Sequence, residues 1–85
     1  MRWTVTWHPV AENRLADLWS AGPDRQAIAD AADTIDMLLA RDPLNQGESR
    51  TEKHRIMIVP PLAAHFEVSE DDRIVHVLEV WRVKG

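Results

Sequence analysis

Side chains suited to acid–base chemistry gather in the C-terminal half of this 85-residue chain. Cleaving a phosphodiester without a metal requires a base for the attacking hydroxyl, an acid for the leaving oxygen, and cations that stabilise the phosphorane charge. His65 and Glu67 stand close enough in sequence to share one face of an extended strand, where they could form a histidine–carboxylate pair. The cationic and histidine side chains available for these roles are Lys53, His54, Arg55, His65, His76 and Arg82.

Some of these side chains also have an expected structural role. Arg55 is expected to pair with a carboxylate or with loop carbonyls. His76 lies between two valines and is expected to be a half-buried, hydrogen-bonded histidine. His8 precedes Pro9 at a predicted helix start, so a capping or packing role is expected for it. The catalytic and structural interpretations of the first two residues both stay open from sequence.

The elements that would position these residues follow a restrictive order. Apolar residues first alternate, as in a half-buried strand, and then recur at helical spacing in two stretches separated by a glycine–proline break. Three further stretches, divided by two prolines and by a polar turn, are typical of strands. The expected boundaries are about Arg2 to Trp7 for a strand, His8 to Ser20 and Pro23 to Arg41 for helices, and Lys53 to Val59, Leu62 to Val68 and Ile74 to Arg82 for strands.

This order predicts one α+β domain over residues 1–85, arranged β-α-α-β-β-β, with a mainly antiparallel sheet packed on a helical hairpin. In the last strand the apolar parity changes around Leu78, which indicates either a fully buried strand or a bulge at that residue. Residues 42–49 are expected to form a loop because of their proline, glycine and asparagine. The predicted core contains Trp3, Val5, Trp7, Leu15, Leu18, Ile28, Ile35, Leu39, Ile56, Ile58, Phe66, Val75 and Val77.

Composition and charge narrow the classes of protein. The chain has no cysteine, which excludes disulfides and thiolate metal sites. Asp30, Asp33 and Asp36 form an acidic stripe on the second predicted helix. No histidine lies near it in sequence, so it is interpreted as a solvated face. No metal and no other cofactor are expected.

The net charge of −4 and the pI of about 5.4 argue against strong direct binding to nucleic acid, since dedicated binders typically exceed a pI of about 9. The excess acid lies in residues 1–49, with four basic and eight acidic side chains, whereas residues 50–85 hold six of each. No run approaches the roughly 18 apolar residues of a membrane span, and the N-terminus lacks the apolar segment of a signal peptide. A cytoplasmic protein without membrane contact is expected.

Several short sequence words stand in a characteristic order along nearly the whole chain. They are Val5-Thr6-Trp7-His8-Pro9-x-Ala11-Glu12-x-x-Leu15, Asp42-Pro43-Leu44, Arg55, Pro60-Pro61-Leu62, Phe66-x-Val68, Asp72-Arg73, Val75-x-Val77 and Val80-Trp81-Arg82. Their order and spacing resemble the RelE/ParE toxin superfamily of type II toxin–antitoxin modules, which includes plasmid-stabilisation-like toxins. The resemblance implies the same β-α-α-β-β-β arrangement that the periodicities predict.

The resemblance implies one of two activities. RelE-like members are ribosome-dependent mRNA endonucleases and ParE-like members poison DNA gyrase, and in both groups an antitoxin segment wraps the toxin. RelE-like nucleases usually carry an arginine early in the third strand and a tyrosine or histidine near the C-terminus. Here Ala63 occupies the first position, and the chain has no tyrosine and no histidine after His76. A ParE-like toxin that inhibits an essential target such as DNA gyrase by binding is therefore favoured.

Two alternatives stay open. A degenerate relative would bind an antitoxin without being toxic. A ribosome-dependent endonuclease would act without metal through Lys53, His54, Arg55, His65 and Arg82. If the chain acts by binding, the candidate target-binding residues are Arg55, Trp81 and Arg82, because tryptophan and arginine are enriched at interface hot spots. The expected partner is a cognate antitoxin laid along the helical hairpin or a sheet edge, and the possible targets are DNA gyrase and the ribosome.

Overall fold

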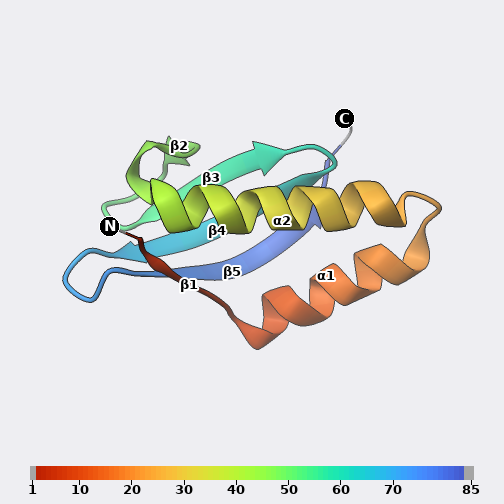
Figure 1. Ribbon diagram of the computed structural model, residues 1–85, viewed down its shortest axis with the longest axis horizontal. Coiled ribbons are helices and arrows are strands. Elements are labelled where there is room, and N and C mark those ends of the chain that lie inside the picture. Colours follow the sequence, from red (N-terminus) through yellow and green to blue (C-terminus); the bar gives the residue numbers. More distant parts are fainter. Residues whose placement is uncertain (1, 84–85) are drawn as a thin grey trace.

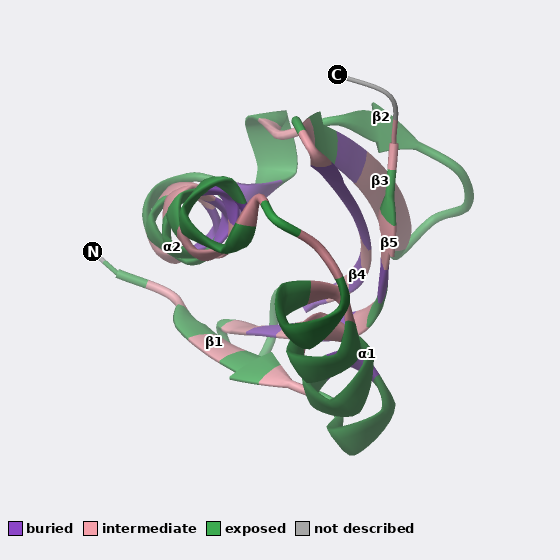
Figure 2. Ribbon diagram, turned by 90° about the vertical axis from the view of Figure 1, so that its right-hand side faces the viewer, coloured by how far each residue is buried: buried purple, intermediate pink, exposed green. Residues whose placement is uncertain are grey.

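The first and the last strand of the chain lie side by side in one sheet, with the first strand at its edge. The computed structural model describes residues 2–83. The sheet order is β1-β5-β4-β3-β2, in which β1 runs parallel to β5 and the other neighbours are antiparallel. The two helices cover one face of this sheet and leave the other face free (Figure 1, Figure 2). The elements are β1 (Thr4–Trp7), α1 (Pro9–Ala21), α2 (Arg25–Arg41), the 3-10 helix η1 (Pro43–Asn45), β2 (Glu48–Ser49), β3 (His54–Val59), β4 (Leu62–Ser69) and β5 (Ile74–Arg82).

The start of α1 follows from its local sequence. His8 is the N-cap, and its Nδ1 accepts a hydrogen bond of 3.1 Å from the Val10 backbone N–H. Pro9 occupies the first turn, where a missing N–H costs nothing, and Glu12 complements the positive end of the helix dipole. The predicted capping role of His8 is therefore confirmed. The second helix begins at Arg25, two residues after the predicted start at Pro23.

The core lies between the helices and the covered face of the sheet. Of the predicted core residues, six are fully buried, namely Ile28, Ile35, Leu39, Phe66, Val75 and Val77. Five more are partly buried and pack against this cluster, namely Trp3, Val5, Trp7, Leu15 and Leu18.

The predicted inward-facing residues of β3, Ile56 and Ile58, were wrong, because the opposite set of side chains faces the core. Ile58 is 62% exposed and Ile56 is only partly buried, whereas Met57 between them is 3% exposed and belongs to the core. Met57 pairs with Ala64, whose side chain faces the helices, so Ile56 and Ile58 point to the free face. Because β3 is apolar at successive positions, its sequence does not indicate which set faces inward.

The bulge expected near Leu78 is present. His65 pairs with Glu79 and the next residue, Phe66, pairs with Val77, so Leu78 is the extra residue of β5. The bulge resets the alternation of the strand, and this lets Val77 and Val80 both enter the core.

Residues 42–49 are more ordered than the expected loop, since they form η1 and the short strand β2. Gly47 joins the two with a φ of +66°, a conformation that favours glycine. A Cβ at this position would lie 2.1 Å from the Ile56 carbonyl oxygen, so the turn also needs the missing side chain. This close approach brings the β2 backbone into register with β3.

Candidate functional site

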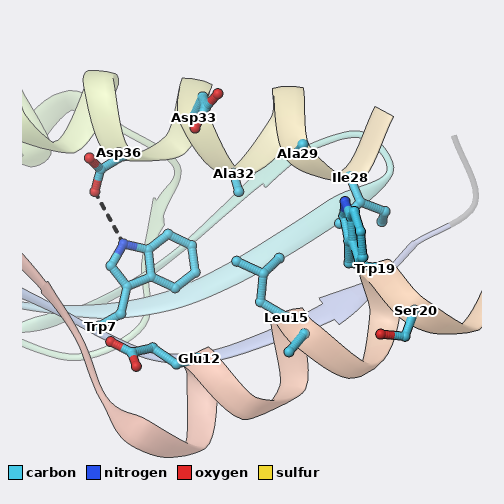
Figure 3. A pocket seen from close by; sticks show the side chains of 11 residues that line it. Trp7, Glu12, Leu15, Trp19, Ser20, Ile28, Ala29, Ala32, Asp33 and Asp36 are labelled. Carbon is cyan, nitrogen blue, oxygen red and sulfur yellow. Dashed lines mark hydrogen bonds between the residues drawn. The ribbon is translucent and has the colours of Figure 1, made fainter. Parts of the chain in front are cut away.

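An apolar groove runs between α1 and α2. Leu15 from α1 and Ile28 and Ala32 from α2 face one another across it (Figure 3). The groove has a volume of about 820 Å³, which is room for several apolar side chains. It is lined by Trp7, Glu12, Leu15, Ala16, Trp19, Ser20, Ile28, Ala29, Ala32, Asp33 and Asp36.

A tryptophan stands at each end of the groove (Figure 3). At one end the Trp7 indole N–H donates a hydrogen bond of 3.1 Å to Asp36 Oδ1, which ties β1 to α2. At the other end the Arg25 guanidinium stacks over the Trp19 ring, 4.7 Å from its centroid. Trp19 itself is 42% exposed, so a large aromatic face remains open to a partner.

The rim of the groove is acidic. Glu12, Asp33 and Asp36 are exposed around it, and no lysine or arginine is among its described lining residues. An apolar floor with an acidic rim favours a partner that presents apolar side chains flanked by basic ones.

Acidic residues on the same helix form no metal site. Asp30 accepts a hydrogen bond from Gln26 Nε2, Asp36 accepts one from Trp7, and both carboxylates are exposed. Within residues 2–83 no group of three or more histidine, aspartate or glutamate side chains could hold a metal ion. The interpretation of the acidic stripe as a solvated face fits this arrangement.

The free face of the sheet carries a chain of titratable side chains. His54 Nδ1 and His65 Nε2 lie 2.9 Å apart, and one of these nitrogens donates a hydrogen to the other. The outer nitrogens face carboxylates, with His54 Nε2 3.4 Å from Glu67 Oε2 and His65 Nδ1 3.7 Å from Glu79 Oε1. Such a pair can accept a proton at one ring while it releases one from the other, which is the requirement for acid–base work.

The arginines of the predicted catalytic set lie away from these histidines. Arg55 pairs in register with buried Phe66, and Arg82 pairs with buried Leu62, so both belong to the covered face of the sheet. His54 pairs with Glu67 on the free face. Of the residues proposed for a nuclease, Arg55 and Arg82 therefore lie on one face of the sheet and His54 and His65 on the other.

Both arginines have structural partners. Arg55 Nε donates to the Gln46 carbonyl at 2.8 Å and Nη2 donates to the Gly47 carbonyl at 3.1 Å, in agreement with the predicted contact to loop carbonyls. Arg82 contacts Asp24 through two hydrogen bonds of 2.5 and 3.2 Å. These bonds lower the pKa of the Asp24 carboxyl and raise the pKa of Arg82.

The remaining candidates are dispersed. Lys53 is exposed just before β3 and lines a hollow with Arg55. Trp81 is half-buried on the free face, where it pairs with Ala63. His76 is half-buried, with its Nδ1 2.7 Å from Thr6 Oγ1, which confirms the expected hydrogen-bonded histidine.

No helix within residues 2–83 is long and apolar enough to cross a membrane.

Solved structures with the same arrangement define the fold. The chain is similar to a chain of the toxin–antitoxin complex RelBE2 from Mycobacterium tuberculosis, with a TM-score of 0.78 and 19% identity over 96% of this chain and 99% of that one. A chain of the chromosomal ParDE toxin–antitoxin system from P. aeruginosa gives a TM-score of 0.74 and 20% identity over 96% and 97% of the two chains. The isolated E. coli RelE toxin gives 0.68 and 8% over 98% and 86%. No protein-family model matches the chain, and no curated protein does.

Because the sequence identities are 20% or less, these comparisons show a shared fold. The chain has the α+β fold found in the RelBE and ParDE systems, over almost its whole length. The predicted fold class is therefore confirmed, with the short strand β2 as an addition to it.

Proposed function

We propose that this chain is the toxin of a type II toxin–antitoxin module of the RelE/ParE superfamily, and that a segment of its antitoxin binds in the groove between α1 and α2. The groove is the observation that carries the proposal, because Leu15 and Trp19 of α1 line it and are not fully buried by the chain itself. The shared fold and the ordered sequence words support the same superfamily.

The expected antitoxin segment is an amphipathic helix or an extended strand with apolar anchors and flanking lysine or arginine. Apolar anchors would fill the space beside Leu15, Ile28 and Ala32, and the basic residues would meet Glu12 and Asp33 at the rim. A partner that binds only the folded chain stabilises it by about 2.7 kcal/mol at 100 times its dissociation constant. This is a large gain for a domain of 85 residues.

We further propose ParE-like inhibition by binding, of a target such as DNA gyrase. The support is the commitment of Arg55 and Arg82 to structural partners, which leaves neither guanidinium free to stabilise a phosphorane beside the histidines. Trp81 on the free face stays a candidate for target binding.

The docking surface is tested by co-expression of the chain with the protein encoded by the adjacent reading frame. Ala32→Glu places a charge in the groove and should abolish co-purification and the gain in melting temperature. Ala27→Glu is the matched control, because Ala27 is exposed on the same helix and does not line the groove. Retained binding in Ala32→Glu would contradict the groove as the docking surface.

Toxicity is tested by induced expression without that neighbour, with growth and plasmid supercoiling as readouts. Arrested growth with altered supercoiling supports the gyrase target. Normal growth together with a stable complex would instead identify a non-toxic relative.

A metal-independent mRNA endonuclease is the second candidate, and the contact between His54 and His65 favours it. Its test is a purified translation system in which mRNA is mapped for cleavage on the ribosome. The binding proposal predicts no cleavage by the antitoxin-free chain. Site-specific cleavage that disappears in His65→Ala and persists in His8→Ala would replace the binding proposal by the nuclease.

A further inference from the structure

The turn between α1 and α2 is tied to the end of the last strand. Arg82 Nη1 and Nη2 donate to the two carboxylate oxygens of Asp24, so the contact is bidentate. The two residues are 58 positions apart in sequence, and neither lines the groove. The pair ties the turn of the helical hairpin to the end of β5.

The Asp24 carboxylate is diverted from its ordinary local role. Asp24 is the N-cap of α2, where an aspartate usually accepts a hydrogen bond from a backbone N–H of the first turn. Here its side chain makes no capping bond and points to Arg82 instead. The Asp24 side chain thus contacts Arg82 of β5 in place of a backbone N–H of its own helix.

Gly22 in the turn leaves room for this ion pair. A Cβ on Gly22 would lie 2.9 Å from Asp24 Oδ1 and 3.1 Å from Arg82 Nη2. Both distances are tighter than ordinary van der Waals contact, so a glycine lets the ion pair close directly over the turn.

The same turn holds one end of the groove. Arg25 follows Asp24 in the chain, and its guanidinium stacks over the ring of Trp19. Trp19 lines the groove beside Ile28 (Figure 3). A shift of the turn would therefore move the cation that lies against this wall of the groove.

We propose that Arg82 is a positioning residue for the groove: its bidentate contact with Asp24 fixes the interhelical turn, and through Arg25 it fixes the ring of Trp19 at the groove end. This gives Arg82 a structural role on the face of the sheet that the helices cover, and that role is distinct from contact with a target. The biological use of this device rests on the proposed docking of an antitoxin, but the positioning itself is a property of the free chain.

The experiment uses the full chain labelled with 5-fluorotryptophan, whose fluorine resonances report the surroundings of each of the four tryptophans. Trp19→Phe assigns the Trp19 resonance. Arg82→Gln removes the ion pair and is expected to displace the Trp19 resonance while that of Trp3 stays in place. Arg82→Lys keeps the charge but loses the fork and should give a smaller displacement in the same direction.

Arg50→Gln is the matched control, because Arg50 forms an exposed ion pair with Glu48 and does not line the groove. It should leave Trp19 unmoved. A Trp19 resonance that is unchanged in both Arg82 variants would overturn the proposal and make the contact an ordinary surface ion pair. If Arg82→Gln collapses the dispersion of all four resonances, Arg82→Lys alone decides. Since no antitoxin is present, the result is independent of whether the toxin proposal holds.

Discussion

The two helices of the hairpin are both amphipathic, yet they are buried to different extents. α2 buries Ile28, Ala31, Ile35 and Leu39 against the sheet. Among the residues of α1, Ala11 alone is fully buried, although the helix carries two leucines and a tryptophan on its apolar side. Figure 2 shows the same contrast, with a buried stripe along α2 and mostly exposed positions along α1.

The difference separates apolar residues that hold the fold from apolar residues that the fold leaves accessible. The apolar stripe of α2 closes the core, whereas the stripe of α1 is wide enough to reach beyond it into the groove. Val10 is 58% exposed at the start of α1, and Trp19 is open near its end. Of these two residues only Trp19 lines the groove, and a contiguous apolar groove, unlike a singly exposed residue, is typical of an interaction site.

The sharpest test of the contrast is Leu39→Ala in α2. Leu39 is fully buried, so its truncation should lower the free energy of unfolding by about 2–5 kcal/mol through lost transfer energy and a cavity. Urea denaturation followed by far-ultraviolet circular dichroism measures this change. A loss below about 1 kcal/mol would mean that α2 does not close the core.

Leu15→Ala in α1 should have a smaller effect on the free chain. The Leu15 side chain is only partly buried and borders the groove, so roughly 1 kcal/mol is expected. The same denaturation series gives the value. If the proposed antitoxin segment fills the groove, the penalty should be larger in the complex than in the free chain. An equal penalty in both forms would place the partner elsewhere.

Val10→Ser should change the stability of the free chain by no more than about 0.5 kcal/mol, since the side chain already faces water. Calorimetric melting of the variant beside the parent chain measures the shift. A larger loss would show that the start of α1 is held by contacts that its exposure does not reveal.

Asp24→Asn should have the smallest effect, and that effect should depend on pH. The hydrogen bond from Arg82 lowers the pKa of Asp24 in the folded state, so folding favours the ionised form. This contribution is fully present above the unfolded value of about 3.9 and is lost as pH falls through the lower folded value. The difference in melting temperature between the parent chain and Asp24→Asn should therefore be constant above pH ~5. It should shrink as the pH falls below about 4 and through the folded pKa of Asp24. A difference that stays constant through acid would exclude the ion pair as its source.

The elements that were predicted correctly are those with local signals. His8-Pro9 contains both a cap and a helix-starting proline, so the start of α1 could be located without any distant residue. The parity change around Leu78 marked the place of the bulge, with a fully buried strand as the alternative, because alternation within one strand reports its own register.

The candidate site was predicted less well, because a site depends on which strands become neighbours. Arg55 and His54 are adjacent in sequence but point to opposite faces of the sheet. Arg82 was a candidate for catalysis or for target binding, and its partner Asp24 belongs to the turn between the helices. Nothing near either residue in the sequence indicates the other.

The sequence by itself determined the type and order of the main elements and the start of α1, and it limited the parity change in β5 to a buried strand or a bulge, because each of these depends on residues within a few positions of one another. The tertiary structure decided the rest. It set the inward parity of β3, which is apolar on both sides, and it made the contact between His54 and His65, which lie on different strands. It also decided that α1 is only half-covered: the sheet and α2 bury part of its apolar face, and the rest lines the groove. These outcomes depend on how separate elements share a limited buried volume, and that competition is resolved only when the chain is packed.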